Sequence, residues 1–187
     1  MSVNNLSGKK VVIIGGTAGI GLATAVAASE LGAKVWAAGR SQAHIEKAKE
    51  VSGGKFEVRS ADTHNSEELR AIFEEVGSID HLVSAAVGGD RTLKPFVEQT
   101  EEQFKAAYGK LWGYAKVVRE GVSYLSENGS ITLVSGSPAR KITPATSALS
   151  CVGGSVENMV RCLAVELAPI RVNVVSPGTI DTAMFDH

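Results

Sequence analysis

Short apolar runs alternate with longer segments of helical periodicity along the whole chain. The runs are rich in β-branched residues and apolar on both faces, which is typical of parallel strands covered by helices on each side. Strands are predicted over residues 9–14, 34–38, 55–59, 79–83, 130–134 and 170–175, with a turn at Asn128-Gly129 before the fifth. Helices are predicted over residues 19–31, 42–51, 67–76, 100–126 and 145–168, with Ser41 and Ser66 as candidate N-caps.

This alternation predicts an α/β fold with a doubly wound parallel sheet of the Rossmann type. Crossover connections between parallel strands are almost always right-handed, so the helices divide between the two faces of the sheet. A chain of 187 residues without repeats or linkers predicts one domain over residues 1–187. Such sheets bind ligands at the carboxyl ends of their strands, and the loop-like stretch Gly88–Thr92 follows the fourth strand there.

Composition and charge narrow the classes of partner. The chain is 44% apolar and 21% charged, with a net charge of −1, which argues against nucleic acid as a main partner. No apolar run resembles a signal peptide or reaches membrane-spanning length, so no membrane partner is expected and the cytoplasm is the expected compartment. Cys151 and Cys162 lie too far apart on one helix for a disulfide and are predicted to be free, buried thiols. The four histidines show no metal-ligand spacing, so no metal is expected.

Four glycines separate the first strand from the first helix: Gly15, Gly16, Gly19 and Gly21. A tight turn that leads into a helix N-terminus presents backbone N–H groups and the positive end of the helix dipole to an anion. The position between strand and helix predicts a pyrophosphate site. The alternative interpretation is a turn that serves only close packing of the helix on the sheet.

The spacing from Gly15 to Gly21, G-x-x-x-G-I-G, resembles the fingerprint of the short-chain dehydrogenase/reductase family. The segment "SADT" at 60–63 and the segment from Leu163 to Thr182 resemble that family as well. The resemblance implies a nicotinamide-dependent oxidoreductase with a small-molecule substrate, in which Asp62 bonds the adenine. Further cofactor-binding positions implied by the family are Thr17, Ile20, Ser41, Thr63, Ser84, Ala85, Ala86, Pro177, Gly178, Ile180 and Thr182.

The end of the second strand predicts which cofactor is used. A carboxylate about 20 residues beyond the glycine turn would bind the ribose 2′-hydroxyl of NAD. Here Gly39 stands at that place and Arg40 follows it. A guanidinium binds a phosphate well, whereas a carboxylate would repel it, so NADP(H) is predicted over NAD(H). The alternative for Arg40 is a solvated surface charge.

The family's catalytic residues are an Asn, a Ser, a Tyr and a Lys, and the resemblance places a different residue at each of the four positions. These are, in order, Lys110, Gly136, Leu149 and Gly153, which makes the catalytic tetrad degenerate. Leu149 and Gly153 carry no group that could donate a proton. The segment where the family keeps its acid is therefore chemically inert in this chain.

Two main interpretations follow, and a third is weaker. In a reductase with a non-standard proton route, Lys110 would donate the proton and Ser135 or Ser137 would polarise a substrate oxygen. Lys110 could instead be a surface or subunit-contact lysine, and the serines could make only local hydrogen bonds. In the second interpretation the chain binds NADP(H) without turnover, as a sensor, scaffold or partner subunit. A nucleophilic Cys151 is the third, and no histidine lies near it in sequence.

Family members usually continue beyond the Pro-Gly turn with a substrate-covering segment, a helix and a seventh strand. The resemblance therefore implies that these parts are missing from residues 1–187, by truncation or because the sheet edge is closed in another way. It also implies a homodimer or homotetramer that forms through the predicted helices 100–126 and 145–168. The substrate is not identified, because the resemblance implies that the residues that would shape its pocket lie partly beyond His187.

Overall fold

A computed structural model describes residues 5–87 and 92–180 and shows a parallel sheet of six strands in the order β3-β2-β1-β4-β5-β6. Its strands are β1 (Lys10–Ile14), β2 (Lys34–Gly39), β3 (Glu57–Ser60), β4 (Ile79–Ser84), β5 (Leu125–Val134) and β6 (Arg171–Val175). Its helices are α1 (Gly19–Glu30), α2 (Gln42–Ser52), α3 (Ser66–Val76), α4 (Glu101–Ala107), α5 (Gly109–Gly121) and α6 (Ser147–Glu166). Short 3₁₀ turns are η1 (Phe96–Glu98), η2 (Val122–Tyr124) and η3 (Ser137–Ala139). The predicted doubly wound fold is confirmed.

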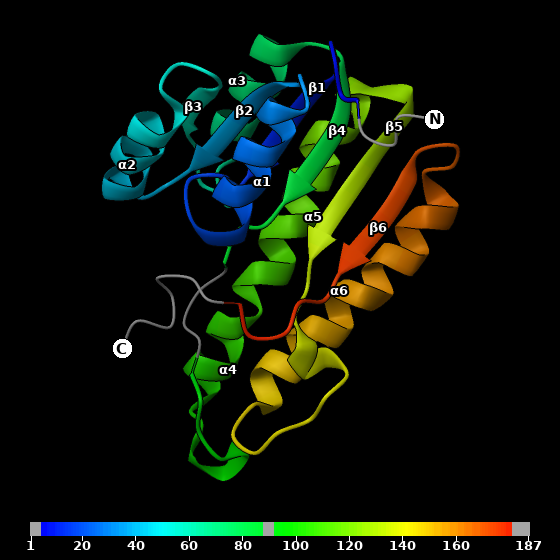
Figure 1. Cartoon of the computed structure of the whole chain (residues 1–187). Coiled ribbons are helices and arrows are strands. Elements are labelled where there is room, and N and C mark those ends of the chain that lie inside the picture. Colours follow the sequence, from blue (N-terminus) through cyan, green and yellow to red (C-terminus); the bar gives the residue numbers. More distant parts are fainter. Residues whose placement is uncertain (1–4, 88–91, 181–187) are drawn as a thin grey trace.

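The helices form two layers around the sheet (Figure 1). On one face α1 and α2 bury alternate side chains of the first three strands, including Val11, Ile13 and Val35. On the other face α3, α5 and α6 bury the intervening side chains, including Ile14 and Leu133, in the larger core cluster. Burial on both faces explains why the inner strands β1 and β2 read as continuous apolar runs. All six strands therefore end at the same edge, where α1 begins and where α4 and η3 lie.

The predicted helix over residues 100–126 is wrong, because three elements and the start of a strand occupy this segment. The helix is interrupted at Tyr108, and α5 then ends at Gly121, where an added Cβ would come within 2.8 Å of the Leu82 side chain. β5 already begins at Leu125, so the predicted turn at Asn128-Gly129 lies inside a strand. The pairing of β4 with β5 shifts register between Ile79 and His81, which accommodates these residues.

Two smaller predictions also need correction. Asn65, not Ser66, caps α3, since its side chain accepts hydrogen bonds from the N–H groups of Glu67 and Glu68. Cys151 and Cys162 are free, as predicted, but both are exposed because they lie on the outer side of α6. Within residues 5–87 and 92–180, no helix is long and apolar enough to span a membrane, and no cluster of side chains could hold a metal ion.

Candidate functional site

The glycine turn after β1 is held together by the protein's own backbone. Gly15 has a positive φ of 84°, and a side chain there would overlap the backbone at Ala86. The N–H groups of Gly15 and Gly16 donate to the carbonyl of Ala38, at 2.7 and 2.9 Å. A Cβ at Gly21 would overlap the Gly15 carbonyl oxygen, so α1 packs against the turn with no space for a side chain at this position. These glycines shape the turn, but the first two amides are not available to a ligand.

The first turn of α1 provides the open donors instead. Gly19, Ile20 and Gly21 begin the helix, and the preceding residue, Ala18, provides no side-chain cap. A helix leaves its first N–H groups without backbone partners, and no acidic side chain lies in this turn. An anion with several oxygen atoms can accept these hydrogen bonds and is favoured by the helix dipole. The residues present therefore fit a diphosphate.

The end of β2 is closed to a side chain at position 39. Gly39 lies directly against Thr17, whose side chain is only 5% exposed, and a Cβ on Gly39 would overlap the threonine hydroxyl. An aspartate or glutamate cannot stand there unless Thr17 moves. Because Thr17 excludes a carboxylate at position 39, the charged side chain at this end of β2 is that of Arg40.

Arg40 and Asp62 form a loose ion pair at that rim, with Nη1 and Oδ2 3.6 Å apart. The arginine side chain is 61% exposed, so it can turn toward a ligand at little cost. Ser41 caps α2 through a long hydrogen bond of 3.5 Å from the His44 N–H. Thr63 packs against Gly113 of α5, which fixes the loop after β3 next to that helix.

The end of β4 carries a buried hydroxyl without a partner. Ser84 is fully buried, and its Oγ makes no hydrogen bond among the described residues. A buried polar atom without a partner is unfavourable, which makes this position suited to a bound group or water. The next residue, Ala85, donates its N–H to the Ile14 carbonyl at 2.8 Å, and Ala86 lies against the glycine turn.

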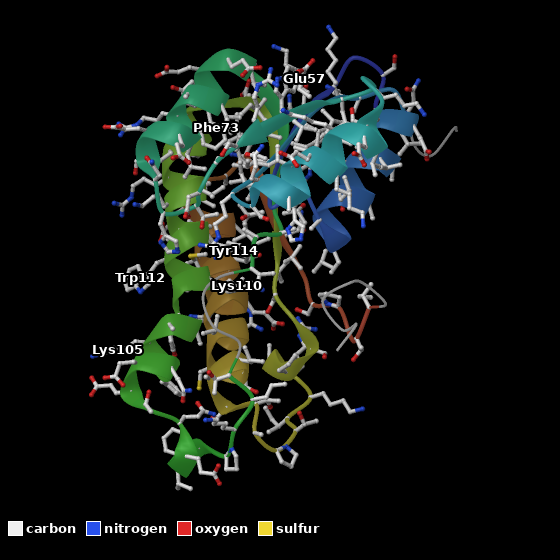
Figure 2. The ribbon with its side chains drawn as sticks, turned by 90° about the vertical axis from the view of Figure 1, so that its left-hand side faces the viewer. Glu57, Phe73, Lys105, Lys110, Trp112 and Tyr114 are labelled. Carbon is white, nitrogen blue, oxygen red and sulfur yellow. The ribbon has the colours of Figure 1, made fainter. Side chains whose placement is uncertain are left out.

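The Lys110 side chain reaches the carboxyl end of β5. The half-buried side chain extends from α5, and its Nζ donates to the Ser135 carbonyl at 3.1 Å. The ammonium also lies 5.4 Å from the centre of the Tyr114 ring. Figure 2 shows Lys110 and Tyr114 on one side of α5, with Trp112 on the other. The predicted lysine therefore points toward the site edge of the sheet.

Tyr114 is not available as an acid at this edge. Among the described residues it is the largest fully buried side chain, and its hydroxyl donates to the Val134 carbonyl at 3.0 Å. Burial raises the pKa of this phenol far above its usual value, and the hydrogen bond offsets little of that effect. A phenol that stays protonated and is bonded to the backbone acts as a structural support for β5.

The loops after β5 and β6 are joined at the same edge. Ser135 donates its N–H to the Val175 carbonyl and Ser137 donates its N–H to the Pro177 carbonyl, both at 2.8 Å. Pro177 thus lies beside Ser137, and Gly178 and Ile180 follow it in the chain. Thr182 lies outside the described residues. The structure places the described candidates at one edge of the sheet, from the glycine turn to the Pro-Gly segment.

Comparisons with known proteins identify this arrangement. A family model described as Enoyl-(Acyl carrier protein) reductase matches residues 15–187. A glucose 1-dehydrogenase from Gluconobacter oxydans is 34% identical over 96% of this chain and 72% of that protein. A short-chain dehydrogenase/reductase from Stachybotrys chlorohalonatus is 31% identical over 96% and 77% of the two chains. The chain belongs to the short-chain dehydrogenase/reductase family.

A solved structure agrees with that assignment. The MalC reductase/Diels-Alderase from Malbranchea aurantiaca superposes with a TM-score of 0.84 at 31% identity, over 95% of this chain and 76% of that one. Membership in this family implies an oxidoreductase with a nicotinamide cofactor, NAD or NADP. The interpretation of the chain as a binding module without turnover gains no support from these relatives.

The predicted position of the family's lysine is occupied by other parts of this chain. Gly153 of α6 lies against η3, and a Cβ there would come within 2.9 Å of the Ala139 Cβ and 3.2 Å of the Ser135 Oγ. The Ser135 hydroxyl donates to the Gly153 carbonyl at 3.0 Å and is buried. Leu149 lies half-buried one turn earlier on the helix, and Gly136 lies half-buried between the two serines. The space is filled by backbone and small side chains.

Sequence reasoning missed one charged residue near this edge. Glu157 on α6 is only 7% exposed and binds Arg140 and Ser176, which come from two other segments. Its position within an otherwise apolar helix face was the available signal, since acidic side chains are rarely buried without partners.

Proposed function

We propose that this short-chain dehydrogenase/reductase is an NADP(H)-dependent oxidoreductase that transfers a hydride to or from a small carbonyl-like or conjugated substrate. The contact between Thr17 and Gly39 carries the choice of cofactor, because it leaves no room for the carboxylate that would select NAD. Arg40 follows directly and is exposed enough to reach a 2′-phosphate. When bound, the nicotinamide would accept or supply the hydride.

Each part of the cofactor would have its own group of residues. The N–H groups at the start of α1 would donate hydrogen bonds to the diphosphate, and Arg40 would exchange Asp62 for the 2′-phosphate. Asp62 and Thr63 would bind the adenine, and the Pro177–Gly178 turn would meet the nicotinamide end. Ser84 could satisfy its buried hydroxyl against the same ligand.

Lys110 is the proposed proton donor, because its ammonium already lies at the end of β5. Among the two serines, the contacts favour Ser137 for polarising the substrate oxygen. The Ser135 hydroxyl is committed to the Gly153 carbonyl and would instead hold α6 against β5. A cation held in a partly desolvated site can stabilise negative charge on a substrate oxygen and return a proton to it.

The first test is cofactor binding. Calorimetric titration with NADPH and NADH should show tighter binding of NADPH, and Arg40→Ala should weaken NADPH at least tenfold more than NADH. Arg70→Ala, on the far helix α3, is the matched control and should change neither. Equal affinities of the wild type for both nucleotides at equal salt would refute the NADP assignment.

The second test is turnover. Loss of NADPH absorbance with a panel of ketones, quinones, enones and imines would demonstrate the reaction class. Saturable binding of NADPH without turnover on any substrate class would instead support the binding-module interpretation.

We further propose a homodimer or homotetramer in the cytoplasm. A groove of about 290 Å³ runs between α5 and α6, lined by Ala115, Val118, Met159 and Leu163 among others. Trp112 continues the same face of α5 and is 66% exposed, so a second copy of the chain could cover both. Two exposed, unpaired cysteines are compatible with a reducing compartment.

A further inference from the structure

Glu157 is a buried carboxylate that joins three segments of the chain. It lies on α6 and is 7% exposed. The Arg140 Nε donates to both of its oxygens, at 3.1 and 3.0 Å, and the Ser176 hydroxyl donates to Oε1 at 2.5 Å. Arg140 follows η3 and Ser176 follows β6, so the carboxylate links a helix to the two loops on either side of it.

Both loops lead directly to the candidate site. Ser176 is the residue before Pro177, and the Pro177 carbonyl accepts the Ser137 N–H at 2.8 Å. The carboxylate thus fixes one side of the Pro177–Gly178 turn, while η3 fixes the other. The adenine half of the site, at α1, Arg40 and Asp62, makes none of the described contacts with Glu157.

We propose that Glu157 is a positioning residue for the nicotinamide half of the cofactor. The inference rests on the proposed function, in which the Pro177–Gly178 turn meets that half. Without the charge on Glu157, the bonds from Ser176 and Arg140 weaken, and the turn no longer holds one conformation. A ligand that needs the turn then has to order it on binding, whereas a ligand that stops at the adenosine does not.

Two ligands separate the halves of the site. NADPH spans the whole cofactor, and 2′,5′-ADP carries only the adenosine half with its 2′-phosphate. In the variant Glu157→Gln we expect the Kd of NADPH to rise about tenfold, as for the loss of charge-assisted hydrogen bonds, and the Kd of 2′,5′-ADP to change less than about twofold. Ser176→Ala removes one hydrogen bond and leaves the ion pair with Arg140, so it should raise the Kd of NADPH by a smaller factor.

The matched control is Glu127→Gln, which neutralises an exposed glutamate on β5 and should change neither Kd. Circular dichroism of each variant establishes whether it is folded. If Glu157→Gln does not fold, the two Kd values of Ser176→Ala are compared with those of the wild type instead. Equal changes in both Kd values, or no change in either, would overturn the inference. Wild-type protein that binds neither ligand would refute the proposed function, which the inference needs.

Discussion

The Ala139 methyl group lies where a side chain on Gly153 would have to begin. A Cβ at Gly153 would stand 2.9 Å from the Ala139 Cβ, a distance that real pairs of such atoms do not adopt. Gly153 is in the middle of α6, where glycine is unfavourable by about 1 kcal/mol relative to alanine. The close packing of η3 on α6 therefore explains a glycine that helix propensity alone would reject.

Gly153→Ala should lower the free energy of unfolding by about 1 kcal/mol, because overpacking outweighs the gain in helix propensity. Gly154→Ala is the matched control, since a Cβ there meets nothing within 4 Å, and it should raise stability by about 0.5 to 1 kcal/mol. Urea unfolding of both variants measures the difference. If both substitutions stabilise equally, Ala139 yields easily and the contact does not exclude a side chain.

This contact also predicts that a tyrosine and a lysine cannot simply be introduced at the two positions where the resemblance places the family's pair. In Leu149→Tyr with Gly153→Lys, the lysine stem has to displace Ala139 and the Ser135 hydroxyl. We expect less stable protein and no gain in turnover of NADPH. Adding Ala139→Gly should recover part of the stability, and a fully active double variant without it would contradict the packing argument.

The contact between Thr17 and Gly39 makes a similar prediction for cofactor choice. Gly39→Asp alone should destabilise the protein by about 1 to 3 kcal/mol and should not produce tight NADH binding, because Thr17 occupies the space. Gly39→Asp combined with Thr17→Gly should shift the ratio of the two Kd values toward NADH by at least about tenfold. Titration of both variants with NADH and NADPH is the measurement. Tight NADH binding by the single variant would show that the threonine is no barrier.

Lys110→Met tests the proposed proton donor while keeping most of the side-chain stem. We expect kcat to fall about 100-fold, the usual contribution of a general acid, with the Kd of NADPH changed only slightly. Lys105→Met is the control, because Lys105 is 71% exposed and pairs with Glu101 on α4 (Figure 2). An unchanged kcat in Lys110→Met would remove the lysine from the mechanism.

The sequence predicted the sheet well because β1, β2 and the end of β5 are buried apolar runs. It failed between Thr100 and Gly129, where two helices, a 3₁₀ turn and the start of β5 follow one another without a proline. There α5 ends at Gly121, where an added Cβ would come within 2.8 Å of the side chain of Leu82, a residue distant in the chain. Tertiary packing decides where such helices end, and local helix propensity does not predict that packing.

The site was predictable only where backbone geometry restricts the residue type. A glycine-rich turn between a strand and a helix, and an arginine directly after a strand, can both be recognised in a sequence. The contacts of Thr17 with Gly39, of Ala139 with Gly153 and of Glu157 with its partners join segments that come together only in the fold. The exposure of both cysteines was missed for the same reason, because the covered face of α6 depends on what packs against it.

Self-association through α5 and α6 can be tested at Trp112. Trp112→Glu should lower the apparent mass in sedimentation at micromolar concentration, because a charge on the proposed contact face must be desolvated for the copies to associate. Val97→Glu is the control, since Val97 is 89% exposed on η1 and lies away from that groove. A wild-type monomer, or equal effects of both variants, would contradict the proposed contact face.

Glu157 should also make the fold sensitive to acid. The hydrogen bond from Ser176 lowers the pKa of this carboxyl below its usual value of 4.5, burial opposes that effect, and Arg140 adds to it. With a lowered folded-state pKa, the unfolded chain takes up the proton first as the pH falls. The contribution to stability is therefore complete above about pH 5 and is lost as the pH falls through the folded-state pKa. The difference in unfolding free energy between wild type and Glu157→Gln should be largest near pH 7 and should shrink as the pH falls well below the usual carboxyl pKa of 4.5. Urea unfolding at several pH values measures it, with Glu127→Gln as the exposed control. A difference that stays constant across this range would mean that the ionised form of Glu157 is not what holds the two loops.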